Sequence, residues 1–327
     1  MLIRSRRNRQ SDAVRALVRE FDLRPEKLIF PLFITQGSGI KEEIASLPGN
    51  YRMSLDEVLK EIGECVQLGL KTFILFPKIK AENKDKRATY SYQEDNFYLK
   101  AAQRIKEVYP QICLMSDVAM DPYNIDGHDG IVAEGQILND ETLEVLSKMA
   151  LAQAMAGFDY LGPSDMMDGR VRHIRQTLDQ NNFKNTGIIS YTAKYASAFY
   201  GPFRDALDSA PVEDPDIPRD KKSYQMDPAN RREALLEAQQ DMEEGADILM
   251  VKPALHYMDI ISDLRQYSDR PIAAYHVSGE CAMLIAACQK GWLDFDQCMP
   301  ETLLSIHRAG ADIILTYFAK QYAQWWK

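Results

Sequence analysis

The sequence is poor in cysteine, and its cysteines show no pairing pattern. Five occur in 327 residues, an odd number, and no two of them form a CxxC motif. A disulfide framework is therefore not expected, and the chain is typical of a reduced, cytoplasmic protein. Glycine-rich phosphate loops of the GxGxxG or GxxxxGK type are also missing, and no organic cofactor is expected.

Long apolar runs and an excess of positive charge are missing as well. No run is long enough to span a membrane, and no signal-peptide pattern opens the chain. The net charge is -9, so binding to nucleic acid or to an anionic membrane is not expected. Against this balance, the first nineteen residues carry six arginines. We expect residues 1–25 to form an arm that makes oligomer contacts, and binding of anions by this basic segment stays open.

Short apolar runs alternate with amphipathic stretches along the whole chain, which is 46% hydrophobic. Strands that alternate with helices pair in parallel through right-handed crossovers. The pattern predicts an α/β fold, a (β/α)8 TIM barrel over residues 26–327, with a doubly wound open sheet as the alternative. Eight runs have the length of a buried strand: Leu28–Ile34, Thr72–Phe76, Ile112–Val118, Asp159–Gly162, Gly187–Tyr191, Asp247–Val251, Pro271–Val277 and Asp312–Tyr317.

One segment interrupts this alternation. Residues 195–225 are rich in proline and charge, and they lie between two lysine-bearing strands. A loop of this length in a compact domain is usually functional or disordered. Because barrel active sites lie at the carboxyl ends of the strands, the position favours an active-site lid that carries Arg204 and Lys221. A merely solvated loop is the alternative.

Two lysines follow directly on apolar runs: Lys194 ends TGIISYTAK, and Lys252 ends ADILMVK. Partial burial disfavours the charged ammonium, and a second cation nearby disfavours it further. An uncharged amine attacks carbonyls and forms Schiff bases. Neighbouring strands lie about 4.8 Å apart, so the two amines are expected to be close. A single strand-end lysine is more often a salt-bridge partner, but the pair predicts an enzyme that activates two ketones.

Polar residues also follow other predicted strands. Residues 117–130 hold four carboxylates and a histidine, a set that suits Mg²⁺ better than Zn²⁺, although a polar turn without an ion is an equal alternative. Arg170 is expected to form a structural ion pair with Asp165 or Asp168. Ser278 is predicted to be a helix N-cap, with free backbone N–H groups suited to binding a carboxylate.

At this point the chain resembles porphobilinogen synthase, also called 5-aminolevulinate dehydratase. The resemblance implies a TIM barrel with an N-terminal arm, usually assembled as a homo-octamer. It also implies condensation of two 5-aminolevulinate molecules to porphobilinogen, with loss of two waters, in tetrapyrrole biosynthesis. The matching stretches are specific and lie in family order: DVAMDPYNIDGHDG, PSDMMDGRV, SYTAKYASAFYGPFRDA, SYQMDPANRREALLE, GADILMVKP, YHVSGECAM and GADIILTY.

The resemblance also implies roles for single residues. Lys252 would be the Schiff-base lysine of the A site, and Lys194 would be the lysine of the P site. A larger set would bind the substrates: Arg204, Lys221 and Gln225 the A-site carboxylate, Ser278 and Tyr317 the P-site carboxylate, and Asp117 and Ser164 the P-site amino group.

The chain departs from the zinc-dependent members of the family, which have three cysteines in DVCLCxxxxxGHCG. Ala119, Asp121 and Asp129 stand at those positions, so zinc is not expected. Asp121 and Asp129 are instead possible ligands of another active-site ion. Many members have a separate regulatory, allosteric Mg²⁺ site, and its glutamate matches Glu237. Cys281 stands where the family usually has tyrosine.

Two other functions stay open on the residues alone. A class I aldolase would also use a Schiff base, but it needs only one lysine and leaves the motif around Lys194 unexplained. A non-catalytic barrel that serves as a binding protein predicts no covalent adduct with aminolevulinate.

Overall fold

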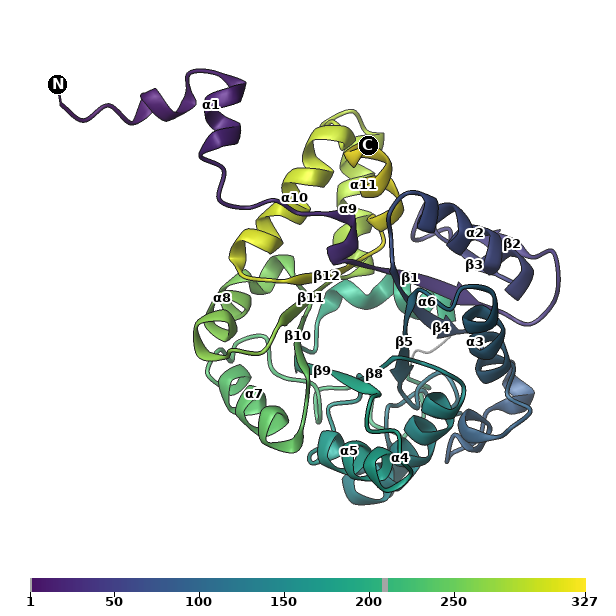
Figure 1. Ribbon diagram of the computed structural model, residues 1–327. Helices are drawn as coiled ribbons and strands as arrows, with labels where there is room; N and C mark the ends of the chain where they lie inside the picture. Colours follow the sequence, from purple (N-terminus) through teal and green to yellow (C-terminus); the bar gives the residue numbers. More distant parts are fainter. Residues whose placement is uncertain (1, 208–210) are drawn as a thin grey trace.

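Eight parallel strands close into a ring in the computed structural model, which describes residues 2–207 and 211–327 (Figure 1). Hydrogen bonding runs in the order β1–β4–β5–β8–β9–β10–β11–β12, and β12 pairs with β1. The prediction of a (β/α)8 barrel is thereby confirmed, because an open sheet would leave two free edges. The strands are β1 (Leu28–Ile34), β4 (Thr72–Pro77), β5 (Cys113–Val118), β8 (Tyr160–Pro163), β9 (Gly187–Lys194), β10 (Ile248–Lys252), β11 (Ile272–His276) and β12 (Ile313–Thr316).

Helices surround the ring, so the strands are buried on both faces and appear in the sequence as continuous apolar runs (Figure 1). In α2, Val58, Ile62 and Cys65 recur at helical spacing and form its buried face. The helices are α2 (Leu55–Gln67), α3 (Phe97–Val108), α4 (Asn139–Met155), α5 (Arg170–Gln180), α6 (Gly201–Leu207), α7 (Glu233–Glu244), α8 (Met258–Tyr267), α9 (Ser278–Gln289), α10 (Phe295–Ala309) and α11 (Ala319–Trp326). None of the helices in the described part of the chain is long and apolar enough to cross a membrane.

Four short strands are present that the sequence pattern did not predict. β2 (Lys41–Glu43) pairs with β3 (Tyr51–Met53), and β6 (Ile131–Ala133) pairs with β7 (Gln136–Leu138), both antiparallel. Three residues are too few to show the alternation that marks a strand.

The N-terminal arm extends away from the barrel (Figure 1). It contains a 3₁₀ turn (Ser5–Arg9) and α1 (Asp12–Leu17), neither of which has a buried residue. Leu2 and Leu17 are 95% and 83% exposed. An apolar side chain gains nothing from such exposure, so nothing buries this outer part of the arm. The base of the arm is held to the barrel, because Phe21 packs against His307 and the Tyr322 hydroxyl donates to the Leu23 carbonyl.

The segment expected to be a lid, residues 195–225, is partly helical. A 3₁₀ turn (Ala198–Tyr200) leads into α6, whose Phe203 backbone N–H donates to Ser278 Oγ at 3.0 Å. Residues 208–210 of this segment lie outside the described residues. Further on, the Met226 backbone N–H donates to the Lys194 carbonyl, which fixes the far end of the segment to the end of β9.

Candidate active site

The two lysines lie side by side at the carboxyl ends of neighbouring strands. Lys194 ends β9, Lys252 ends β10, and the two are paired in register. Both are buried, at 5% and 7% exposure. Sequence analysis ended the first of these strands at Tyr191, whereas the pairing continues to Lys194. The extension places both amines at the same level of the barrel.

Four aromatic rings surround the Lys252 amine. Its Nζ lies 4.6 Å from the Tyr275 ring, 5.1 Å from Tyr191 and Tyr200, and 5.2 Å from Phe203. Aromatic faces favour a cation by about 2 kcal/mol or more at a desolvated site. Burial and the charge of Lys194 have the larger effect, and they lower the pKa of Lys252 to about 7. A substantial fraction of this amine is therefore uncharged at neutral pH.

Lys194 faces the turn after β8. Its Nζ donates to the Ser164 backbone carbonyl, and it lies 5.9 Å from the Tyr191 ring. Tyr191 therefore contacts the space between the two lysines. Its hydroxyl is buried and has no hydrogen-bond partner among the described residues. Nothing in the sequence marks Tyr191 beyond its being an aromatic residue in a strand.

Ser278 and Tyr317, which the resemblance assigns to the Lys194 site, contact residues that surround Lys252. Tyr275, which packs over Lys252, shares a hydrogen bond of 2.8 Å with Tyr317 through the two hydroxyls. Phe203, on another side of Lys252, donates to Ser278. Ser278 and Tyr317 are therefore each one contact away from the Lys252 amine. This arrangement favours them as the clamp of the Lys252 site, and the pairing of each lysine with its clamp stays a prediction.

The other expected clamp gathers at one cavity. Arg204, Lys221 and Gln225 line a cavity of about 710 Å³ together with Ser197. The Gln225 Oε1 atom is buried and lacks a hydrogen-bond partner within the described ranges. One guanidinium, one ammonium and one amide are thus available to a carboxylate beneath the lid.

Lys221 also contacts the aspartate-rich segment. Its Nζ lies 3.1 Å from Asp121 Oδ2 and 2.8 Å from Asp129 Oδ2, and the Tyr224 hydroxyl donates to Asp129 at 3.0 Å. Burial acts to raise the pKa of Asp129, but Lys221 and Lys194 hold it well below its usual range. Burial acts to lower the pKa of Lys221, but the two carboxylates raise it. Asp129 and Lys221 therefore stay charged.

This ion triad bears on the expected metal ion. Lys221 supplies the positive charge between Asp121 and Asp129, and Ala119 contributes no ligand. In the described residues, no group of three or more acidic, histidine or cysteine side chains is arranged to hold a metal. The two aspartates with their lysine do not fit a resident metal ion, and we derive no step through one.

Glu237 lies in a different pocket, of about 620 Å³, between α7, the turn after β8 and the lid segment. Asp168, Asp227 and Glu233 line the same pocket. Burial, together with the charges of Asp241, Asp168 and Glu233, raises the pKa of Glu237 to about 7, against the opposing effect of Arg170. These carboxylates line one cavity and are the kind of oxygen ligand that Mg²⁺ prefers, but among the described residues they are not gathered closely enough to form a ligand group.

Asp117 lies buried near both lysines at the end of β5. Burial and the neighbouring Asp121 raise its pKa to about 7, although Lys252 acts in the opposite direction. Its Oδ1 atom lacks a hydrogen-bond partner in the described structure. A carboxyl group with this pKa exchanges protons readily at neutral pH.

Known proteins resemble the chain along almost its whole length. Residues 2–325 match the delta-aminolevulinic acid dehydratase family. Identity to the delta-aminolevulinic acid dehydratase of Chlamydia pneumoniae is 49% over 316 residues, covering 97% of this chain and 94% of that protein. The chain belongs to the delta-aminolevulinic acid dehydratase family. The family predicted from the sequence motifs is confirmed.

Delta-aminolevulinic acid dehydratases of other organisms extend the comparison. A chloroplastic member from Chlamydomonas reinhardtii is 47% identical over 327 residues, which cover 98% of this chain and 84% of that one. The crystal structure of the Toxoplasma gondii member, in complex with the reaction product porphobilinogen, superposes with a TM-score of 0.96. It is 49% identical and the match covers 99% of this chain and 92% of that chain. The barrel is therefore that of a delta-aminolevulinic acid dehydratase.

Proposed function

We infer that this chain is a porphobilinogen synthase, which condenses two molecules of 5-aminolevulinate to porphobilinogen with release of two waters. The observation that carries the inference is the in-register pair of buried lysines, Lys194 and Lys252. Each amine attacks one ketone and forms an imine, with loss of one water. One carbon–carbon and one carbon–nitrogen bond then join the substrates, and both lysines are released as free amines.

We assign each substrate one lysine and one carboxylate clamp. The contacts support a site with Lys252, Ser278 and Tyr317, and a second site with Lys194 beneath the lid clamp. Holding both ketones on adjacent strands makes the bond-forming steps intramolecular, which lowers their entropic barrier by several kcal/mol. Asp117 and Ser164 lie beside Lys194 and Lys252, and we assign the exchange of protons with the reacting amines to Asp117.

The direct test is product formation. Purified protein incubated with 5-aminolevulinate should form porphobilinogen, detected by mass spectrometry at half the molar amount of substrate consumed. Consumption of aminolevulinate without porphobilinogen, or cleavage of a carbon–carbon bond as in an aldolase, would contradict the inference.

The pKa of Lys252 predicts pH-dependent imine formation. Below pH 7 the ammonium form predominates and does not attack a ketone, whereas above pH 7 the free amine predominates. The initial rate of borohydride trapping of levulinate, the substrate without its amino group, should rise about tenfold from pH 6 to pH 8 at Lys252 and then level off. Peptide mass spectrometry measures the adduct. A midpoint near the pKa of an ordinary exposed lysine would contradict this assignment.

For the pocket around Glu237 we propose a regulatory Mg²⁺ site. The supporting observation is a half-buried carboxyl whose pKa is raised to about 7 and which lines one cavity together with Asp168, Asp227 and Glu233. Bound Mg²⁺ would neutralise these groups and connect α7 with the lid segment. No zinc is proposed, and no organic cofactor.

EDTA should therefore lower activity about tenfold, and Mg²⁺ should restore it, whereas Zn²⁺ should not be needed. Glu237→Gln keeps the shape of the side chain and removes its charge, so this variant should lose the response to Mg²⁺. Activity assays over a Mg²⁺ titration measure both effects. A Glu237→Gln enzyme that still required Mg²⁺ would contradict the assignment of this site to Glu237.

We also propose that the chain assembles as a homo-octamer in the cytoplasm. The exposed apolar side chains of the arm, including Leu2, Ile3 and Leu17, support its role in contacts between subunits. The five cysteines are all free, which supports a reducing compartment. Light scattering of the full chain and of a chain that begins at Arg24 would measure the role of the arm.

A further inference from the structure

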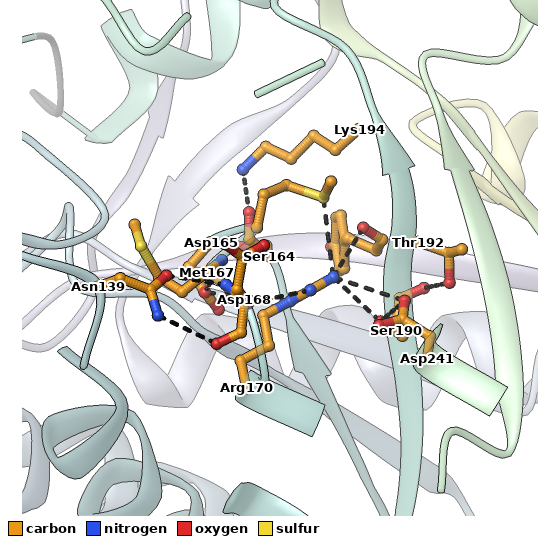
Figure 2. A network of polar contacts seen from close by, with 12 residues as sticks. Asn139, Ser164, Asp165, Met167, Asp168, Arg170, Ser190, Thr192, Lys194 and Asp241 are labelled. Carbon is orange, nitrogen blue, oxygen red and sulfur yellow. Dashed lines mark hydrogen bonds and ion pairs between the residues drawn. The ribbon is translucent and has the colours of Figure 1, made fainter. Parts of the chain in front are cut away.

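Arg170 opens α5 and is buried among charged and polar groups (Figure 2). It is 2% exposed. Asp165 lies 4.0 Å from its Nε atom and Asp241 lies 3.6 Å from its Nη2 atom. Sequence analysis expected an ion pair with Asp165 or Asp168, and the pairing with Asp165 is the one observed. A fully buried arginine carries a large desolvation cost, so its contacts are informative.

The first contact of Arg170 is with the turn that follows β8. Its Nη1 donates to the Met167 carbonyl at 3.3 Å, and its Nη2 lies 3.7 Å from the Met166 sulfur. Met166 has a φ of 72°, a left-handed conformation that side chains other than glycine rarely adopt. Such a turn persists only where neighbouring contacts hold it. The turn begins beside Ser164, whose carbonyl accepts from the Lys194 amine (Figure 2).

The second contact is with β9 at an irregular point of the strand. Arg170 Nη2 donates to Ser190 Oγ and to the Tyr191 carbonyl, both at 3.2 Å. The register between β9 and β10 shifts here: Leu249 pairs with Ser190 and Val251 pairs with Ala193. Two steps on β10 therefore correspond to three on β9, which is a β-bulge.

The bulge determines whether the Lys194 side chain faces the surrounding helices or the inside of the barrel. Ser190 faces the helices, because its hydroxyl donates to Asp241 of α7 at 2.6 Å. Side chains alternate along a regular strand, so a residue four positions after Ser190 would face the helices too. The extra residue reverses this phase, and Lys194 instead meets the Tyr191 ring and the Ser164 carbonyl inside the barrel.

We propose that Arg170 is a positioning residue that fixes both the β9 bulge and the turn beside Ser164, and thereby aims Lys194 at its ketone. Arg170 touches neither lysine; it contacts the two backbone segments between which the Lys194 amine is held (Figure 2). The proposal rests on the proposed function, because it assumes that Lys194 forms an imine. Lys252 shares only the Tyr191 ring with the bulge. Its other contacts, with Tyr200, Phe203 and Tyr275, lie on other elements, so its imine depends less on Arg170 than that of Lys194.

The test is Arg170→Lys in the full-length enzyme, which keeps the charge and loses the fork of donors. Levulinate and borohydride serve as the probe, and peptide mass spectrometry reports the reduced adduct at each lysine separately. We expect trapping at Lys194 to fall roughly 10- to 100-fold and trapping at Lys252 to change less than about twofold. Porphobilinogen formation should fall with the Lys194 adduct.

Arg175→Lys is the matched control. Arg175 lies on the same helix and also donates to two backbone carbonyls, those of Thr186 at 2.7 Å and Phe183 at 3.0 Å, before β9 begins. This variant should leave the ratio of the two adducts unchanged. An equal loss at both lysines in Arg170→Lys, or the same change of ratio in Arg175→Lys, would reduce Arg170 to a structural role. Absence of any Lys252 adduct in the unmodified enzyme would instead contradict the proposed function.

Ser190→Ala is the second variant, in case Arg170→Lys fails to fold. It removes one acceptor of Arg170 at the bulge and leaves the charge in place. Trapping at Lys194 should fall about threefold, with trapping at Lys252 retained. Unchanged trapping at both lysines would overturn the proposal.

Discussion

Replacement of Lys252 by methionine is expected to reduce porphobilinogen formation by about 10⁴-fold or more, the range seen when a covalent catalytic group is removed. Methionine fills similar space within the aromatic cage but has no amine to form an imine. The fold should survive, because the variant removes a buried amine whose pKa burial already depresses. Steady-state assays measure the loss, and circular dichroism checks the fold.

Trapping with levulinate separates this prediction from a general loss of structure. Lys252→Met should still form an adduct at Lys194, and Lys194→Met should still form one at Lys252, but neither variant should make porphobilinogen. Lys290→Met, an exposed lysine at the end of α9, serves as the control. Full condensation by Lys194→Met would leave only one lysine in the mechanism and would support an aldolase-like enzyme.

Replacement of Lys221 by alanine is the second large effect. The change leaves Asp121 and Asp129 as two buried carboxylates without a counter-ion. Truncating one partner of a buried, hydrogen-bonded charge pair costs about 2–5 kcal/mol of interaction free energy. If this cost falls on the binding of substrate in the active site, kcat/KM should fall roughly 10²- to 10³-fold. The unpaired carboxylates would also repel the carboxylate of a substrate beneath the lid, so KM should rise.

Lys222→Ala is the matched control for Lys221. The two lysines are adjacent, but the Lys222 side chain is 72% exposed and lies 3.6 Å from Asp220 at the surface. Its removal should change kcat/KM by less than about threefold. Equal effects of the two variants would show that charge on the lid matters more than the buried triad. Added Mg²⁺ or K⁺ should partly rescue only Lys221→Ala, because the space left by the ammonium then admits a cation.

Local sequence patterns predicted the barrel and its reactive lysines well. Each of the eight strands is an apolar run, which local sequence reveals. Both lysines directly follow such runs, so the short stretch before each lysine already predicted that it is buried at the end of a strand. Arg204, Lys221 and Gln225 were assigned by resemblance, and the structure brings them to one cavity. Their binding roles remain predictions.

Contacts between distant residues could not be predicted in this way. Lys221 forms ion pairs with Asp121 and Asp129, which lie 100 and 92 positions away in the sequence. No local sequence pattern predicts these two ion pairs. The end of β9 was missed because the bulge changes the phase of side chains after Ser190, where a regular alternation was assumed. The side on which each carboxylate clamp lies likewise depends on how the lid folds back over β10 and β11.

The in-register lysine pair has a consequence for the order of events in catalysis. Lys194 favours the neutral form of Lys252 only while Lys194 itself is positively charged. A protonated imine carries the same unit charge as the ammonium from which it came. The electrostatic effect that lowers the pKa of Lys252 therefore persists after Lys194 has bound its substrate covalently. The positive charge that activates the Lys252 amine is therefore still present after the first substrate has bound. Lys252 attacks the second ketone with the same nucleophilicity as before.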